Sequence, residues 1–107
     1  MGKDFTVIYK ILKELDRNAG NEDFDLAMIG AERLGISEAR WEQIVIELAI
    51  NGYIAGVSYT QTLEDKFPHL AHPITPRITL KGMEYLSENS AMKKAGRIVN
   101  GIVDVMK

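Results

Sequence analysis

The sequence contains no cysteine among its 107 residues. Disulfide bonds and thiolate metal sites are therefore excluded, and the composition is compatible with the reducing environment of the cytosol. An excess of positive charge is also absent, because 13 Lys and Arg residues stand against 15 Asp and Glu residues, giving a formal net charge of −2. No bulk attraction to nucleic acid or other polyanions is accordingly expected.

Long apolar runs, internal repeats and low-complexity tracts are missing as well. No stretch approaches the roughly 20 apolar residues that cross a bilayer. Residues 1–16 carry charges of both signs and lack the core of a signal peptide. With 46% hydrophobic residues at this length, the chain has the composition of one soluble domain. We therefore expect a cytoplasmic protein that does not enter a membrane.

Motifs that carry catalysis are not found. The sequence has no Gly-rich phosphate loop, no Gly-x-Ser-x-Gly and no His-Glu-x-x-His. His69 and His72 are spaced as His-x-x-His beside Glu64 and Asp65, but they lie in a loop that contains proline, and a metal site needs a rigid element. We predict a protein that is not an enzyme and has no metal, no cofactor and no small-molecule substrate.

Apolar periodicity predicts two helices in the first third of the chain. The first runs from about residue 4 to residue 17, and its apolar side is formed by Phe5, Ile8, Ile11, Leu12 and Leu15. The second spans residues 26–34, between an N-cap at Asp25 and a stop at Gly35.

A third helix is predicted from Ser37, its N-cap, to about Asn51. Its core stripe consists of Trp41, Ile44, Val45 and Leu48. Gly52 then supplies a left-handed exit. The connection over residues 34–37 is as tight as the turn of a helix-turn-helix.

After the third helix, the pattern changes to that of a β-hairpin. Residues 53–59 are predicted as one strand, and residues 77–79 as its short partner. The polar segment 60–73, which contains Pro68, reads as the loop between them. Thr79 is the expected N-cap of a fourth helix over residues 80–88. Helices, a hairpin and a further helix in this order predict a mainly helical α+β fold, a winged helix-turn-helix over residues 1–90.

The charge pattern argues against the DNA contact that such a fold suggests. Residues 22–51 hold seven acidic residues and two arginines, and the third helix carries Glu38, Glu42 and Glu47 against Arg40. Phosphates repel such a surface, because affinity for DNA comes mostly from Lys and Arg. The candidates for base or phosphate contact are Arg40, Gln43, Asn51, Lys66 and Arg77.

The side of the third helix opposite its core stripe carries Ala39, Gln43, Ile46 and Ile50. An apolar line flanked by glutamates suits a protein partner better than DNA. The alternative is that Ile46 and Ile50 simply belong to the core, covered by other elements.

A last helix is predicted over residues 91–107, and its apolar face spans an arc of about 160°. This face includes Met92, Ile98, Val99, Ile102 and Val105, which are candidates for a homodimer interface. Packing of the same face on the body of the domain is the alternative. Membrane-surface binding is not favoured, because the polar face has few cations and no aromatic anchor.

Several segments together resemble the YjcQ family, small winged-helix proteins found in phage and prophage regions. The matching segments are Ile-Leu-Lys-Glu at 11–14, Asn-Gly-Tyr-Ile-Ala-Gly-Val-Ser-Tyr at 51–59, Pro-His-Leu at 68–70 and Ile-Thr-Leu-Lys-Gly-Met-Glu-Tyr-Leu-Ser-Glu-Asn at 78–89, followed by Lys-Lys-Ala at 93–95. The resemblance covers nearly the whole chain. It implies a winged-helix fold and a phage setting, but it brings no activity and no functional residues.

Two hypotheses of function follow. The first is a DNA-binding regulator of phage origin that contacts double-stranded DNA and forms a dimer. The second is a protein-interaction module that keeps the winged-helix scaffold and does not bind DNA.

Overall fold

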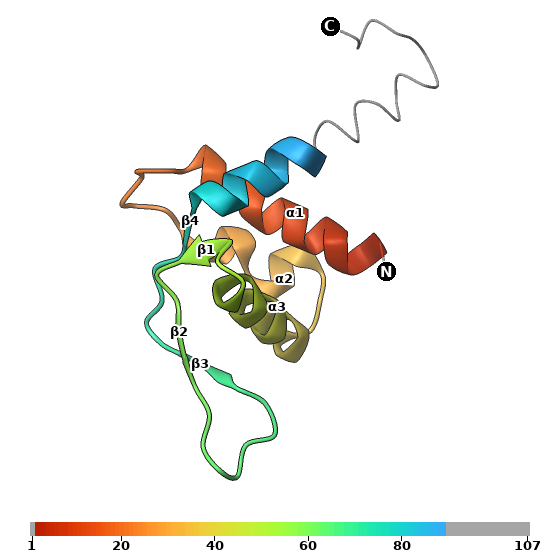
Figure 1. Cartoon of the computed structure of the whole chain (residues 1–107), viewed down its shortest axis with the longest axis vertical. Coiled ribbons are helices and arrows are strands. Elements are labelled where there is room, and N and C mark those ends of the chain that lie inside the picture. Colours follow the sequence, from red (N-terminus) through yellow and green to blue (C-terminus); the bar gives the residue numbers. More distant parts are fainter. Residues whose placement is uncertain (1, 90–107) are drawn as a thin grey trace, which may run out of the picture.

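Helix α1 (Gly2–Arg17) opens the fold and lies across its helical body (Figure 1). The structure, a computed structural model, describes residues 2–89, and side chains from residue 4 onward. Helix α1 buries Val7, Ile11, Leu12 and Leu15 at the three- and four-residue spacing of one helix face. Ile11, Leu12 and Leu15 were predicted for this face, whereas Phe5 is 55% exposed and Val7 takes the inward position.

The predicted second helix is two shorter elements. A 3-10 helix η1 (Leu26–Ile29) is followed by α2 (Ala31–Leu34). Gly30 separates them because its backbone is extended, with φ −79° and ψ 167°. The predicted caps are confirmed: the Asp25 side chain accepts a hydrogen bond from the Ala27 N–H, and Gly35 ends α2 in the left-handed region.

Helix α3 (Glu38–Ile50) matches the predicted third helix. The Ser37 side chain caps it by accepting a hydrogen bond from the Arg40 N–H at 3.1 Å. Its predicted core stripe is buried, and the Trp41 indole N–H donates to the Ile29 carbonyl at 2.6 Å. This bond joins α3 to η1 in the middle of the core.

The predicted hairpin is present but interrupted. Strand β1 (Ile54–Ala55) pairs with β4 (Arg77–Ile78), and β2 (Ser58–Thr60) pairs with β3 (His69–Ala71), both antiparallel. The interruption falls at Gly56, where φ is +82° and the Thr75 N–H donates to the Gly56 carbonyl at 2.9 Å. The single strand predicted for 53–59 is therefore two strands, and part of the predicted loop forms β3.

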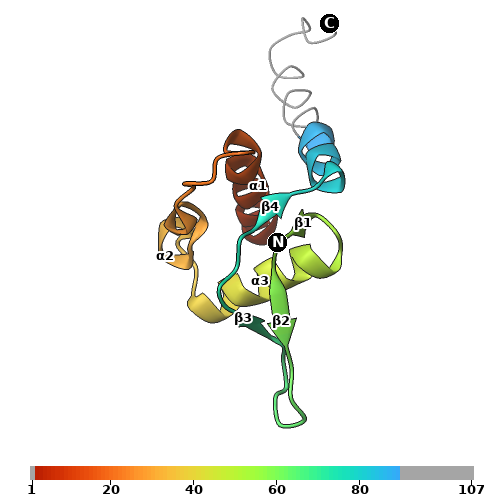
Figure 2. The same cartoon turned by 90° about the vertical axis from the view of Figure 1, so that its left-hand side faces the viewer.

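The hairpin loop extends beyond the helices. In the two views the β2–β3 arm projects from the helical body, and the chain turns back at its far end (Figures 1 and 2). Contacts between α3 and both β1 and β3 hold the base of this arm.

The chain is again helical over residues 80–89, beside α1 (Figure 1). The predicted cap is confirmed, because the Thr79 hydroxyl accepts a hydrogen bond from the Gly82 N–H at 3.1 Å. The same hydroxyl donates toward the Gly52 carbonyl at 2.6 Å, which ties this helix to the end of α3. Tyr85 and Tyr53 meet edge to face, with ring centroids 5.5 Å apart.

One core joins these elements, with apolar side chains from α1, η1, α3 and the strands packed together. Residues 2–89 thus form a mainly helical α+β fold with four α-helices, one 3-10 helix and a small antiparallel hairpin. No helix in this part of the chain is long and apolar enough to cross a membrane. The domain boundary predicted at residue 90 and the helix predicted beyond it lie outside the described residues.

Candidate interaction surfaces

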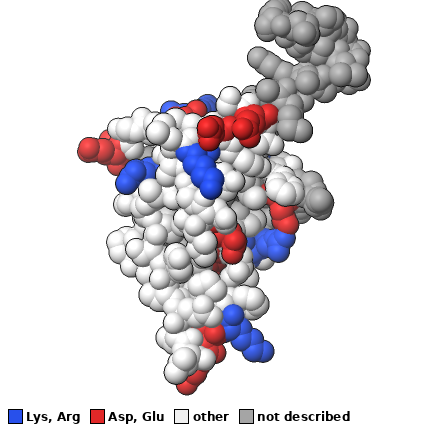
Figure 3. Space-filling view, in the orientation of Figure 1, with Lys and Arg blue, Asp and Glu red and all other residues white. Residues whose placement is uncertain are grey.

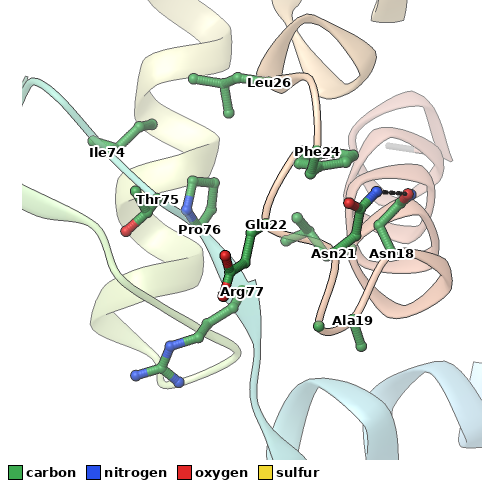
Figure 4. A pocket seen from close by; sticks show the side chains of 12 residues that line it. Asn18, Ala19, Asn21, Glu22, Phe24, Leu26, Ile74, Thr75, Pro76 and Arg77 are labelled. Carbon is green, nitrogen blue, oxygen red and sulfur yellow. Dashed lines mark hydrogen bonds between the residues drawn. The ribbon is translucent and has the colours of Figure 1, made fainter.

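The five candidates for DNA contact come from three separate parts of the fold. Arg40, Gln43 and Asn51 belong to α3 and its C-terminal cap, Lys66 to the hairpin loop, and Arg77 to β4. Figure 4 shows Arg77 at the edge of a groove, with its guanidinium directed away from Phe24 and Leu26. Three of the five candidates therefore lie on α3 and its cap, and the other two lie outside this helix.

Two of the α3 candidates already have partners within the chain. The Arg40 guanidinium forms an ion pair with Asp4 of α1, in which Nε donates to Asp4 Oδ1 at 3.2 Å. The Asn51 amide donates to the backbone carbonyl of Glu47 at 2.8 Å and faces the Glu47 carboxylate at 3.3 Å. The only cation of α3 is thus neutralised, whereas Glu38 and Glu47 remain exposed.

Only one of the two isoleucines predicted on the outward side of α3 is exposed. Ile46 is 1% exposed and belongs to the core, whereas Ile50 is 51% exposed. The prediction of an apolar outward face is therefore wrong for Ile46 and right for Ile50. Strands β1 and β3 pack against α3, and Ile46 belongs to the same core cluster as Ile54 and Leu70.

The hairpin is fastened to α3 by one carboxylate. Glu42 Oε2 accepts a hydrogen bond from the Leu70 N–H at 2.8 Å, and Glu42 Oε1 lies 3.1 Å from His69 Nδ1. The bond from the Leu70 N–H, with help from His69, lowers the pKa of Glu42 below its ordinary value. This contact fixes the angle at which the hairpin leaves the helices.

A second carboxylate organises the hairpin loop itself. Asp65 Oδ2 accepts a hydrogen bond from the Thr62 N–H at 3.0 Å, and this bond lowers the pKa of Asp65. His69 Nε2 lies 4.0 Å from Asp65 Oδ1, so the imidazole stands between two carboxylates. Within the part of the chain that the structure describes, no three His, Asp or Glu side chains are grouped so that they could hold a metal ion.

Large apolar side chains are exposed along the β2–β3 arm, in strand β2 and in the loop that follows it. Leu63 is fully exposed, Phe67 is 59% exposed and Tyr59 is 43% exposed. We call these three residues the hairpin patch. Sequence reasoning missed this patch, although Leu63 and Phe67 in an otherwise polar segment were a visible signal.

The charges around the hairpin patch are mixed. Figure 3 shows that the face of the molecule seen in Figure 1 is mostly uncharged, with acidic and basic side chains interspersed. The loop itself carries Glu64 and Asp65 beside the single cation Lys66. The arm therefore lacks the continuous positive surface that a DNA-binding wing needs.

A groove of about 490 Å³ lies between the α1–η1 connection and the segment before β4 (Figure 4). Its walls are largely apolar and include Leu15, Phe24, Leu26, Ile74 and Pro76, with Glu22 and Arg77 as its charged residues. The Asn21 amide donates to the Asn18 side chain at 3.3 Å at one end. The groove brings together no pair of residues suited to acid–base or nucleophilic catalysis.

The candidate dimer residues Met92, Ile98, Val99, Ile102 and Val105 lie outside the described residues. Their role in self-association stays a prediction.

Comparison with known proteins places the whole chain in one family. The family model described as "YjcQ protein" matches residues 9–105. The "Uncharacterized protein YjcQ" of Bacillus subtilis (strain 168) is 35% identical over 107 residues, which cover 100% of both chains. No solved structure matches significantly. This agrees with the resemblance carried by residues 51–59 and 78–89, and the chain belongs to the YjcQ family.

Proposed function

We propose that this protein is a protein-interaction module built on a winged-helix scaffold, with no enzymatic activity, and that its hairpin patch contacts the partner. The scaffold assignment rests on the order of elements. A short helix, a tight turn over residues 34–37 and the longer α3 are followed by an antiparallel hairpin. In this scheme α3 is the helix that corresponds to a recognition helix, and the β2–β3 arm is the wing.

The observation that carries the proposal is the exposure of Leu63, Phe67 and Tyr59 on a projecting arm. All three fall within residues 59–67 of one arm, large exposed apolar surfaces mark interaction sites, and aromatic residues are enriched in protein interfaces. Burial of one such side chain at the centre of an interface is worth about 1.5–3 kcal/mol. The Glu42–Leu70 bond holds the base of the arm against α3, so the arm loses less conformational entropy when it binds.

The charges of α3 support a protein partner over a DNA groove. Its exposed carboxylates Glu38 and Glu47 face solvent, and Arg40 is engaged by Asp4. A DNA groove approached by this helix would meet net negative charge, and Coulomb repulsion would oppose binding.

Site-specific photo-crosslinking in the native host tests the proposal. A crosslinking amino acid at position 63 is expected to give one discrete protein adduct, and Phe67→Ser in the same chain is expected to abolish it. The matched control carries the crosslinker at Ser87, which is exposed on the helix over residues 80–89. If position 63 gives no adduct, or the same adduct as position 87, the hairpin patch is not the contact surface.

A DNA-binding regulator is the second candidate, favoured by the projecting arm (Figure 1), whose loop between β2 and β3 contains Lys66. In this case α3 enters the major groove and Lys66 contacts a phosphate. A mixed pool of short duplexes at low salt is the test. Arg40→Glu and Lys66→Glu are expected to weaken any complex formed in this way, and the absence of a complex at low salt contradicts it.

Homodimerisation through the segment beyond residue 90 is compatible with both candidates. Ile98→Glu or Ile102→Glu is expected to disrupt self-association, which sedimentation of the full chain measures. A monomeric unmodified protein would contradict the dimer. The phage setting and the cytoplasmic location implied at the outset stay predictions.

A further inference from the structure

Basic residues predominate in a hollow of the described part of the chain. It lies between α1 and α2 and measures about 330 Å³. Lys10, Lys13 and Arg17 line it from α1, and Arg33 lines it from α2. Glu14 is the one carboxylate among the lining residues. We call the four cations the α1–α2 basic face.

The three cations of α1 stand in one row because their positions are three and four residues apart. At a rise of 1.5 Å per residue, the row extends about 10 Å along the helix. Ile11, Leu12 and Leu15 are buried on the opposite side, so the row faces solvent.

Little of this positive charge is neutralised within the chain. Glu14 pairs with Arg17 at 3.5 Å. Across residues 4–89, Lys10, Lys13 and Arg33 take part in no ion pair. The Lys13 ammonium lies 6.0 Å from the centre of the Tyr9 ring, and Arg33 contacts the sulfur of Met28 at 3.5 Å. These contacts position the two cations and leave their charge uncompensated.

The length of the row of cations on α1 favours an extended anion over a single small one. A single phosphate ion spans only one or two of these cations, whereas successive phosphates of a polynucleotide reach the whole row. The contrast with α3 strengthens this assignment, because α3 presents exposed carboxylates and a paired arginine. A polyanion approaching the protein is repelled by α3 and attracted by α1.

We propose that the α1–α2 basic face binds the phosphate backbone of nucleic acid, independently of base sequence. This surface is distinct from the hairpin patch and from α3, so the proposal does not depend on the proposed function. A complex of this kind leaves α3 and the hairpin patch available to a protein partner.

Fluorescence anisotropy with the full-length protein tests the proposal. The probes are a labelled mixed-sequence DNA duplex and a labelled single strand, each titrated at low and at rising salt. We expect binding at low salt to at least one probe, with a log–log salt slope of about −2 to −4 for three or four neutralised phosphates. The double variant Lys13→Glu, Arg33→Glu is expected to lower the affinity at least tenfold.

Matched variants separate this surface from the others. The double variant Arg40→Glu, Lys66→Glu changes the same amount of charge on α3 and on the hairpin, and if the α1–α2 basic face is the contact it is expected to leave the affinity within about twofold. All these positions are exposed, and the fluorescence of Trp41 verifies that each variant is folded. Binding to neither probe, or equal losses in all variants, overturns the proposal.

Competitors identify the ligand class. Inorganic phosphate and polyglutamate, each at matched ionic strength, are expected to displace neither probe. Displacement by phosphate would mean a site for a single anion, and displacement by polyglutamate would mean a site for an acidic protein. Either result overturns the assignment to nucleic acid.

Discussion

The carboxylate of Glu42 in α3 accepts a hydrogen bond from the Leu70 N–H of β3 at 2.8 Å, across 28 positions of sequence. The bond connects α3, which carries three glutamates, with the arm that carries the hairpin patch. Glu42 is thereby a structural residue, although the sequence presents it as one of three similar glutamates on this helix.

Glu42→Gln tests this bond and its pH dependence. The pKa of Glu42 is lowered from 4.5 in the folded protein, chiefly by the Leu70 N–H. Its contribution to stability is therefore fully present above that unfolded value and is lost as pH falls through the lower folded pKa. Glu42→Gln is expected to reduce the free energy of unfolding by about 1–3 kcal/mol at neutral pH.

Thermal unfolding between about pH 7 and pH 3 measures the effect. The variant should show a shallower loss of stability in acid than the unmodified protein. Glu84 is an exposed glutamate on the helix over residues 80–89. The control Glu84→Gln should change neither the stability at neutral pH nor its loss in acid. If Glu42→Gln loses stability in acid as steeply as the unmodified protein does, the Glu42 carboxylate is not the group that titrates.

Trp41→Phe is expected to destabilise the protein by about 1–3 kcal/mol beyond any effect of ring size. The indole N–H donates to the Ile29 carbonyl at 2.6 Å inside the core, and phenylalanine leaves that carbonyl without its donor. Urea unfolding followed by circular dichroism is the measurement, since the variant lacks the single tryptophan. Tyr59→Phe, in an exposed ring, should leave the midpoint unchanged.

Gly56→Ala is expected to cost about 3 kcal/mol or more, or to prevent folding. Gly56 has φ +82°, and an added Cβ would overlap the carbonyl oxygen of Thr75. Gly35→Ala is the comparison, because φ is +74° there but no atom lies within 4 Å of the added Cβ. It should cost only about 1 kcal/mol. Similar midpoints of chemical unfolding for the two variants would show that the backbone of Thr75 does not approach Gly56 as closely as described.

Ile46→Ala and Ile50→Ala are expected to differ clearly in how much free energy of unfolding each loses. Ile46 is 1% exposed, so its truncation should cost about 2–5 kcal/mol. Ile50 is 51% exposed, and its truncation should change stability by about 0.5 kcal/mol or less. Parallel denaturant titrations measure both, and equal losses would place Ile50 in a covered position.

Asp4→Asn is expected to alter stability by less than about 1 kcal/mol, because both partners of the Asp4–Arg40 pair are substantially exposed. The substitution releases Arg40 on α3. If the α1–α2 basic face carries nucleic-acid binding, the affinity for a mixed duplex should change by less than about threefold at matched salt. A tenfold gain measured by anisotropy would instead assign the contact to α3.

Local sequence determined most of the helices and their caps, but not the break at Gly30, the break at Gly56 or strand β3. Ser37, Gly35 and Thr79 act as predicted, because a cap depends on residues within one turn of the chain. The stripe containing Trp41 and Leu48 was equally readable, since burial follows a period of 3.6 residues. The pairing of the chain after residue 53 with the segment at residues 77–79 likewise followed from the order of strand and turn signals, and the structure gives its register as Ile54 opposite Ile78.

Tertiary structure decided the interaction surfaces. No local rule indicates that Asp4 neutralises Arg40, that Glu42 binds Leu70, or that Lys13 and Arg33 line one hollow. These groups are distant in sequence and meet only when the helices pack. Apolar periodicity specifies which side of a helix is buried, whereas the charge that a surface presents is the sum over side chains from several elements.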